Sequence, residues 1–404
     1  MSSQPRPLKL ALVGCGQIAD AHLDQMRRIA GVQVVAVCDV LEDLARQAAE
    51  RFDVPQRFSD VQAMLQAVRP DVLHITTPVQ THAPLAIQAL RSGVHVYVEK
   101  PFTLDAAEAQ HVLDEACAAD RLVCLGHDQL YDPIWLRCRE LCQGGQIGEV
   151  RHVESVLGYP IDGPFGRQVA SDPNHWVRRL PGGLFHNTLS HPLYRITEFL
   201  TDEQPEVWAT WFSHDERYPF PTELRVHLRG RRVTGSLLFT SAVRPRFRRT
   251  RVYGTAGTLD VDLEGQVLRH ERDARLPGVF AKLETPWRQW REAFRNLKTN
   301  IRRFCRSDLH YFAGMRRLFE LFYAAIREGG EPPIPYAEII RFTRLLDTIF
   351  ASCRRWDAVK DWPEDGDVPP LCVSEGDSHF DGIDKSVREL LPVEASASSG
   401  RSRG

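Results

Sequence analysis

The stretch Leu8-Lys9-Leu10-Ala11-Leu12-Val13-Gly14-Cys15-Gly16-Gln17-Ile18-Ala19 decides the fold of the N-terminal part of the chain. It has the pattern of a buried strand that ends in a glycine-rich turn and enters a helix. Gly14 permits the tight turn, and Gly16 lets the backbone approach a pyrophosphate group. Ala19 replaces a third glycine and still allows close packing of the helix on the strand. The stretch therefore predicts a dinucleotide-binding turn.

The residues beyond this turn indicate which dinucleotide it binds. A helix that begins near Gln17 and Ile18 offers free backbone N–H groups to the pyrophosphate. Asp39 lies twenty residues after Ala19, at the end of the next strand. A carboxylate there accepts hydrogen bonds from the adenosine ribose hydroxyls and repels a 2′-phosphate. We therefore predict NAD as the cofactor, with NADP less favoured; the other interpretation of Asp39 is a cap on the following helix.

Short apolar runs alternate with helix-like segments from residue 8 to about 126, which predicts parallel strands joined by helical crossovers. The apolar runs are 10–13, 32–37, 72–75, 94–98 and 122–125, and the helix-like segments are 21–29, 42–52, 83–90 and 106–118. The runs are apolar on both faces, as expected for a sheet that helices cover on both sides. We predict an α/β, doubly wound Rossmann domain over residues 1–126.

The pattern changes after residue 126 to consecutive strands with hairpin spacing, which favours a mainly antiparallel sheet. The expected strands are 150–157, 206–212, 233–239, 249–253 and 258–263, and the expected helices are 133–143, 287–304, 310–327 and 336–354. We predict an α+β domain with an open sheet over 127–358. The remaining residues, 359–404, are first acidic and then rich in Ser, Ala, Gly and Arg, so we expect a flexible tail.

Composition narrows the class of protein. The 404 residues are 43% hydrophobic and 26% charged, which excludes a disordered chain. Lys plus Arg (51) nearly balance Asp plus Glu (53), so we expect no nucleic-acid partner. The nine cysteines are scattered without metal-type pairs, which indicates reduced thiols and no metal site. No apolar run approaches the roughly 20 residues of a membrane helix, and no secretory signal is evident, so we expect a cytoplasmic protein.

Further motifs follow the strands of the predicted Rossmann domain. The third long run is followed by Thr76-Thr77-Pro78 and then Thr81-His82, and the fourth ends in Glu99-Lys100-Pro101. With the opening stretch, and with residues 145–150 and 254–257 of the second domain, these motifs resemble the Gfo/Idh/MocA oxidoreductases. The resemblance covers residues 8 to 355.

This resemblance implies an NAD(P)-dependent dehydrogenase or reductase that acts on a CH–OH group of a sugar, nucleotide sugar or polyol, and it implies a homo-oligomer. It places Lys100 beside the nicotinamide and the substrate, where the lysine hydrogen-bonds the reacting oxygen and shuttles a proton. The residues expected to bind the cofactor are Gly14, Gly16, Gln17, Ile18, Asp39, Thr76, Thr77, Pro78, His82, Glu99 and Lys100.

The second catalytic element of the family is a glycine-rich turn followed by an Asp and, four residues later, a His. Here Gly182-Gly183 precede Asn187 and His191. The spacing of four places Asn187 and His191 on one helical face. His191 matches the family histidine, and we expect it to act as acid or base because imidazole titrates near neutral pH. Asn187 can orient a hydroxyl but cannot supply a carboxylate's charge, which departs from the family pattern.

The segments next to these motifs offer candidate substrate contacts. Trp176, Arg178 and Arg179 precede the glycine-rich turn, and paired arginines bind phosphate or carboxylate groups in a bidentate manner. His127 lies at the domain junction, where it could face the nicotinamide, and His186 is a candidate contact beside Asn187.

Two further functions stay open at this stage. One is NAD-assisted glycoside cleavage, in which the sugar is oxidised, loses its leaving group and is reduced again. The other is a non-catalytic sensor of a dinucleotide or sugar, which the Asn187 substitution makes conceivable.

Residues 287–304 form a basic amphipathic segment. The apolar positions Trp287, Trp290, Phe294, Leu297, Ile301 and Phe304 recur at helical spacing, with Lys and Arg between them. We favour a helix that packs its apolar stripe on this protein or on another subunit. The less favoured interpretation is peripheral contact with a membrane surface.

Overall fold

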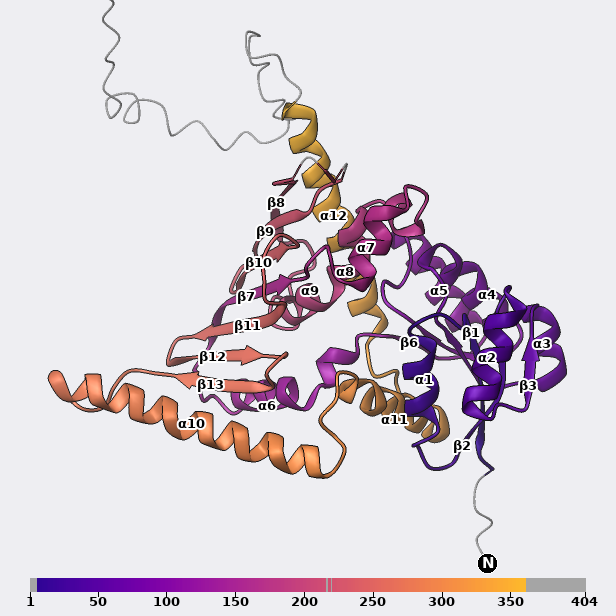
Figure 1. Cartoon of the computed structure of the whole chain (residues 1–404), viewed down its shortest axis with the longest axis horizontal. Coiled ribbons are helices and arrows are strands. Elements are labelled where there is room, and N and C mark those ends of the chain that lie inside the picture. Colours follow the sequence, from indigo (N-terminus) through magenta and orange to yellow (C-terminus); the bar gives the residue numbers. More distant parts are fainter. Residues whose placement is uncertain (1–5, 216, 219, 361–404) are drawn as a thin grey trace, which may run out of the picture. The chain divides into compact units, whose positions relative to one another are not determined.

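The computed structural model describes residues 6–215, 217–218 and 220–360. The expected tail at 359–404 therefore lies almost wholly outside the described residues. Two sheets, each with its own helices, make up the described part (Figure 1).

The N-terminal sheet is a six-stranded parallel sheet in the order β3-β2-β1-β4-β5-β6, which confirms the doubly wound α/β prediction. Its strands are β1 (Leu8–Val13), β2 (Val32–Cys38), β3 (Gln56–Phe58), β4 (Val72–Ile75), β5 (His95–Val98) and β6 (Val123–Leu125). The strand order reverses between β1 and β4. Ligands of such sheets bind outside the carboxyl ends of the strands at this point.

Helices cover both faces of this sheet because its strands bury alternate residues on opposite sides. They are α1 (Ala19–Met26), α2 (Glu42–Phe52), α3 (Val61–Val68), α4 (His82–Arg91) and α5 (Ala106–Ala118), with a 3-10 turn η1 (Val79–Thr81). Ala11 and Val13 pack toward α3, α4 and α5, whereas Leu10 and Leu12 pack toward α1 and α2. The predictions for 42–52 and 106–118 match α2 and α5; β3 and α3 were not predicted.

The second sheet has seven strands in the order β13-β12-β11-β7-β10-β9-β8. They are β7 (Val150–Gly158), β8 (Glu206–Phe212), β9 (Glu223–Arg229), β10 (Thr234–Thr240), β11 (Phe247–Gly254), β12 (Gly257–Asp262) and β13 (Val267–Glu271). All neighbouring strands are antiparallel except β7 and β10. This confirms the mainly antiparallel prediction, although β9 and β13 were missed.

The remaining helices all follow β6 in the chain. They are η2 (Asp128–Tyr131), α6 (Pro133–Gln143), α7 (Pro164–Ser171), η3 (Trp176–Arg179), α8 (Gly183–Thr188), α9 (Ser190–Thr197), α10 (Val279–Cys305), α11 (Ala313–Glu328) and α12 (Tyr336–Lys360). α11 returns to the first sheet, where Phe319 and Phe322 join the core around Leu10 and Leu12. None of the described helices combines the length and the apolar content that crossing a bilayer requires.

α10 departs from the prediction made for residues 287–304. It lies along β13 at the edge of the second sheet (Figure 1), but none of its residues is buried. Of the favoured expectation, packing of the apolar stripe on this protein is therefore wrong for the described chain, while packing on another subunit stays a prediction. The reason is that its polar face, and not its apolar face, contacts β13.

Candidate active site

A cavity of about 300 Å³ lies where the carboxyl ends of β1, β5 and β6 meet the second sheet. It is lined by Gln17, Ile18, Glu99, Lys100, Asp128, Leu157, Tyr159, Phe165, Asn187, Thr188, His191, Arg246, Arg248, Tyr311, Phe312 and Met315. The structure thus brings Gln17 and Ile18, at the end of the glycine-rich turn, into one cavity with Glu99, Lys100, Asn187 and His191. The other predicted cofactor residues, among them Gly14, Gly16 and Asp39, do not line it. A larger cavity of about 610 Å³ lies between α10 and β13 and is lined by none of the predicted catalytic, cofactor or substrate residues, so size alone does not identify the site.

The glycine-rich turn fits a dinucleotide. Gly14 has a φ of +94°, and a Cβ there would lie 2.7 Å from the backbone nitrogen of Thr77, so only glycine is accommodated. A Cβ on Gly16 would meet no atom within 4 Å. This open space beside the turn is where a pyrophosphate would lie against backbone N–H groups. α1 begins at Ala19, between the start expected near Gln17 and the helix-like segment expected from residue 21.

Asp39 both supports this turn and borders open surface. Its Oδ2 accepts a hydrogen bond from the Cys15 N–H at 2.7 Å, and its Oδ1 accepts one from the Leu41 N–H at 2.9 Å. The next two side chains, Val40 and Leu41, are 84% and 60% exposed. A carboxylate followed by exposed apolar groups fits a ribose with an adenine ring beside it.

Several of the predicted cofactor residues act by shaping the loops. The buried Thr76 hydroxyl donates to the Gly14 carbonyl at 2.6 Å, which ties β4 to the turn. Thr77 accepts a hydrogen bond from Thr81, and Pro78 is exposed. The buried His82 ring bonds the carbonyls of Thr77 and Pro101 at 2.9 Å each. His82 therefore connects this loop to the loop that contains Lys100.

Glu99 ends a buried chain of hydrogen bonds. Its Oε1 lies 2.9 Å from His22 Nε2, His22 Nδ1 lies 3.1 Å from His74 Nδ1, and His74 Nε2 lies 2.9 Å from the Tyr323 hydroxyl. Burial lowers the pKa of His74 well below its ordinary value, so this ring is neutral. Because a carboxylate only accepts hydrogen bonds, His22 Nε2 donates to Glu99 at the end of this chain.

This chain keeps Glu99 ionised beside Lys100. Burial alone would raise the pKa of Glu99, but the hydrogen bond from His22 and the charge of Lys100 hold it below its ordinary value. Lys100 Nζ donates to the backbone carbonyl of Asn187 at 3.1 Å. Burial lowers the pKa of Lys100, and the carboxylates of Glu99 and Asp128 oppose that shift.

His191 lines the cavity opposite these charges. Its Nδ1 lies 2.8 Å from the Tyr194 hydroxyl, which fixes the ring. Burial lowers the pKa of His191 well below its ordinary value, and the positive charges of Lys100, Arg195 and Arg248 lower it further. The expectation that His191 titrates near neutral pH is therefore not met. A neutral imidazole with so low a pKa can relay a proton from a bound hydroxyl but does not store it.

Asp128 is a cavity residue that sequence reasoning missed. Burial, followed by the negative charge of Glu99, raises the pKa of Asp128 to about 7, although Lys100 opposes the shift. A carboxyl that titrates near neutrality in a cavity can act as acid or base. The available signal was its place at the junction beside His127, directly after the carboxyl end of β6.

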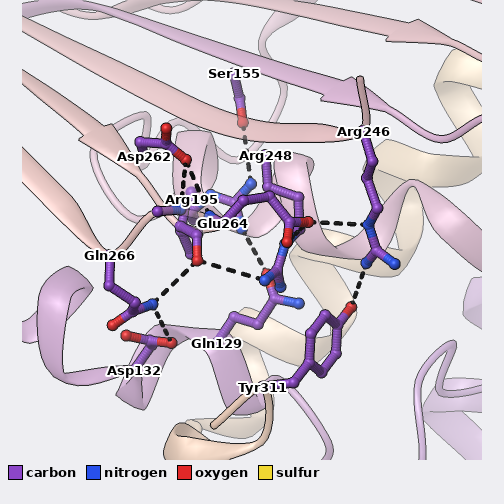
Figure 2. A network of polar contacts seen from close by, with 12 residues as sticks. Gln129, Asp132, Ser155, Arg195, Arg246, Arg248, Asp262, Glu264, Gln266 and Tyr311 are labelled. Carbon is purple, nitrogen blue, oxygen red and sulfur yellow. Dashed lines mark hydrogen bonds and ion pairs between the residues drawn. The ribbon is translucent and has the colours of Figure 1, made fainter. Parts of the chain in front are cut away.

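Sequence reasoning also missed a cationic wall of the cavity, which consists of Arg246 and Arg248. Figure 2 shows Arg246 and Arg248 converging on Glu264, at 2.9 and 2.7 Å, while the Tyr311 hydroxyl accepts from Arg246 at 2.9 Å. Behind them the fully buried Arg195 donates to the neutral oxygens of Gln129, Thr250 and Ser155. Burial lowers the pKa of Arg195 to about 10, so it stays charged at neutral pH. The i, i+2 spacing of Arg246 and Arg248 was the signal for a shared face.

The structure places the five expected substrate contacts outside this cavity. His127 packs between Tyr194 and Phe342, and His186 stacks on Phe350. Burial lowers the pKa of His127 to about 3 and that of His186 to about 4. The remaining three lie on η3: the Trp176 ring stacks on His175, Arg178 lies over the Phe220 ring, and Arg179 is exposed.

Two family models match the sequence of this chain. Residues 8–127 match the family model described as "Oxidoreductase family, NAD-binding Rossmann fold", named GFO_IDH_MocA. Residues 135–260 match the model of the GFO/IDH/MocA C-terminal domain. The two matches together include the turn at Gly14, Asp39, Lys100 and His191.

Among curated proteins, the chain is similar to dehydrogenases. The myo-inositol 2-dehydrogenase of Thermotoga maritima is 24% identical over 202 residues, or 50% of this chain and 58% of the relative. The inositol 2-dehydrogenase of Salmonella typhimurium is 30% identical over 35% of this chain and 43% of the relative. The chain thus matches about half the length of these relatives. The D-apiose dehydrogenase of Paraburkholderia graminis is 24% identical over 87% of this chain and 89% of the relative.

Among solved structures, the fold resembles two oxidoreductases. The WlbA dehydrogenase of Bordetella pertussis, in complex with NADH and UDP-GlcNAcA, has a TM-score of 0.69 at 19% identity and covers 87% of this chain and 96% of its own. An oxidoreductase domain protein of Kribbella flavida has a TM-score of 0.72 at 19% identity and covers 87% and 98%. At these identities the likeness concerns the fold.

Proposed function

Because this chain belongs to the Gfo/Idh/MocA oxidoreductase family, we propose that it is an NAD-dependent enzyme that transfers a hydride between nicotinamide and a hydroxyl-bearing carbon of a sugar, nucleotide sugar or polyol. One observation carries the proposal: Lys100, Asp128 and His191 line the same cavity as Gln17 and Ile18, the residues that end the glycine-rich turn. The names of the similar proteins, inositol 2-dehydrogenase, D-glucoside 3-dehydrogenase and D-apiose dehydrogenase, support the substrate class.

The cofactor is held by the first domain and supplies the hydride chemistry when it is bound. The turn at Gly14 and Gly16, with Gln17 and Ile18, would hold the pyrophosphate, and Asp39 would hold the adenosine ribose. Asp39 disfavours a 2′-phosphate there, so NAD is preferred over NADP. Lys100, directly after the carboxyl end of β5, would lie at the nicotinamide end of the cofactor, since it lines the same cavity as Gln17 and Ile18.

The chain's own residues handle the proton of the reacting hydroxyl. The Lys100 ammonium, held by the Asn187 carbonyl, donates a hydrogen bond to the substrate oxygen and stabilises negative charge on it. The neutral His191 relays the proton as the alcohol is oxidised, and back in the reverse direction, without storing it, because its pKa lies well below its ordinary value. Asp128 supplies the carboxyl group that Asn187 lacks, and it can pass the proton onward since its pKa lies near 7.

The cationic wall indicates which sugars bind best. Arg246 and Arg248 share a single carboxylate, Glu264, and therefore leave excess positive charge at the cavity. Arginine forms paired hydrogen bonds with carboxylate and phosphate groups. A sugar acid or a sugar phosphate is thus favoured over a neutral hexose.

The test begins with binding of NADH and NADPH, followed by absorbance assays on a panel of sugar acids, nucleotide sugars and neutral polyols. We expect NADH to bind more tightly than NADPH, and net NADH formation with an acidic sugar. Lys100→Met should lower kcat by about two orders of magnitude or more, whereas Lys9→Met, on the exposed side of β1, should not. Failure to bind either nucleotide would overturn the proposal. Release of an aglycone without net NADH would favour transient oxidation instead.

A further inference from the structure

α10 is an amphipathic helix whose apolar side is exposed; only Trp287, at the margin of that side, also lines the cavity between α10 and β13. Its 27 residues carry a stripe of aromatic and aliphatic side chains at three- and four-residue spacing, each more than half exposed. The stripe consists of Phe280, Leu283, Trp287, Trp290, Phe294, Leu297, Ile301 and Phe304. Folded proteins rarely leave a contiguous apolar surface of this length uncovered unless it contacts a partner or a membrane.

The polar side of α10 is occupied by the edge of the second sheet. Asn296 Nδ2 donates to the Leu268 carbonyl at 2.9 Å, and its Oδ1 accepts from the Leu268 N–H at 3.4 Å. Glu292 accepts from the His270 N–H at 3.2 Å, and Asn300 donates to the Gly265 carbonyl at 3.1 Å. These side chains satisfy backbone groups of the edge strand β13 and its turn, which strands otherwise leave unpaired.

This attachment holds the stripe outward. Rotating α10 to bury Trp290 or Phe294 against the sheet would break the hydrogen bonds of Asn296 and Glu292 and leave the edge of β13 unpaired. The outward direction of the stripe is therefore part of how the helix is fixed.

The charges around the stripe are of one sign. α10 contains seven Lys and Arg residues but only two acidic ones. Both acids, Glu284 and Glu292, are partly buried and bond backbone N–H groups on the β13 side. The exposed charged side chains of the helix are all cations, namely Lys282, Arg291, Arg295, Lys298 and Arg302. Arg291 lies 4.7 Å from the centre of the Trp287 ring.

We propose that α10 is a docking helix for a membrane surface that contains anionic lipids. Its Trp and Phe side chains would enter the boundary between headgroups and acyl chains, and its cations would contact lipid phosphates. Seven cationic side chains exclude a spanning orientation, so the helix lies in the plane of the surface. A second copy of the chain is a poorer occupant, because pairing two α10 stripes would bring their cationic flanks together.

The test is co-sedimentation of the full chain with vesicles of phosphatidylcholine alone and with vesicles that also contain phosphatidylglycerol. We expect sedimentation with the anionic vesicles at low salt, loss at high salt, and a shift of tryptophan fluorescence to shorter wavelength on binding. The double variant W287S/W290S and the double variant R291E/K298E should each bind about tenfold or more weakly. The matched control is Q289S, which changes an exposed side chain of the same helix outside the stripe.

Each outcome decides the proposal. Urea denaturation of every variant checks that the fold is kept. Vesicle binding needs no cofactor, so failure of this proposal can be told apart from failure of the proposed activity. Absence of binding to anionic vesicles overturns docking, as does binding that W287S/W290S leaves unchanged. If the wild-type chain does not bind vesicles and the W287S/W290S variant has a lower sedimentation coefficient than the wild type, the stripe instead mediates contact between copies of the chain.

Discussion

α10 and α11 follow one another in the chain and are both strongly amphipathic, yet their apolar stripes have opposite surroundings. α11 buries its stripe completely against the first sheet, through Met315, Leu318, Phe319, Phe322 and Tyr323. α10 exposes its stripe over its whole length. The comparison teaches that helical periodicity identifies a stripe but not what covers it.

The polar faces explain the difference. On α11, Arg316 and Arg317 both pair with Glu320 within the helix, and Arg316 also pairs with Asp308. Among the described residues, the single bond from an α11 side chain to the backbone beside a strand is from Arg327, in the last turn, to the Gly31 carbonyl. On α10, Asn296 and Glu292 bond the backbone of β13. A helix whose polar side is engaged by its own protein has only its apolar side left for something else.

The largest expected effect comes from truncating one aromatic residue in each stripe. Phe319→Ala in α11 should lower the free energy of unfolding by about 3–5 kcal/mol, because it removes a buried ring that contacts His22, His74 and Tyr97. Phe294→Ala in α10 should change it by no more than about 0.5 kcal/mol, since the ring is exposed. Urea denaturation without lipid measures both. Equal losses in the two variants would refute the comparison.

The contrast between the helices also marks how far sequence reasoning reaches. α2 and α5 were predicted at their observed bounds because apolar spacing along a helix is local information. β3 was missed because three residues with one apolar side chain become a strand only by pairing with β2. The sides of α10 could not be assigned, since the open edge of β13 that decides them was itself not predicted.

The site residues also separate into those that a local motif predicts and those that depend on the fold. The glycine-rich turn, Lys100 and His191 could be predicted because each belongs to a short motif that is continuous in sequence. Asp128 could not, since its pKa depends on burial and on Glu99 and Lys100, which reach it through the fold. The segment at Trp176 was predicted from residue type alone, and the structure places its side chains outside the cavity.

A second prediction concerns Asp128, on the turn η2 against which α11 packs. The native pKa of Asp128 is about 7 against an ordinary value of 3.8, so the fold favours the protonated form. Its stabilising contribution is complete below pH 4 and is lost as pH rises to about 7. The stability of Asp128→Asn relative to that of the wild type should therefore rise by about 2–4 kcal/mol as the pH goes from 4 to 8.

Denaturation midpoints across that pH range measure this difference. The exposed Asp114→Asn should show no such pH-dependent gain. A gain for Asp128→Asn that stays constant with pH would contradict the assignment. The same variant should also remove an ionisation near pH 7 from the kcat profile.

A third, smaller effect tests the hydrogen-bond chain that joins α11 to Glu99. Tyr323→Phe removes the hydroxyl that bonds His74 and leaves a buried ring nitrogen without a partner. We expect a loss of about 1–3 kcal/mol of stability, with little change in packing because the ring is retained. A double-mutant cycle with His22→Ala should show coupling, since both residues belong to one chain of bonds. Additive losses would show that the chain does not act as a unit.

The smallest expected effect lies on the α10 side of the comparison. Asn296→Ala deletes two hydrogen bonds to the Leu268 backbone, but this residue is only half-buried, so water replaces part of what is lost and global stability should fall by about 1 kcal/mol or less. The local effect should be larger. Hydrogen exchange of the β13 amides should quicken by about tenfold, because the helix that covers this strand edge is then free to separate from it. The exposed Thr299→Ala is the matched control and should leave exchange at β13 unchanged. Unaltered exchange in Asn296→Ala would mean that α10 is held by something other than its polar face, and the outward direction of the stripe would then need a different cause.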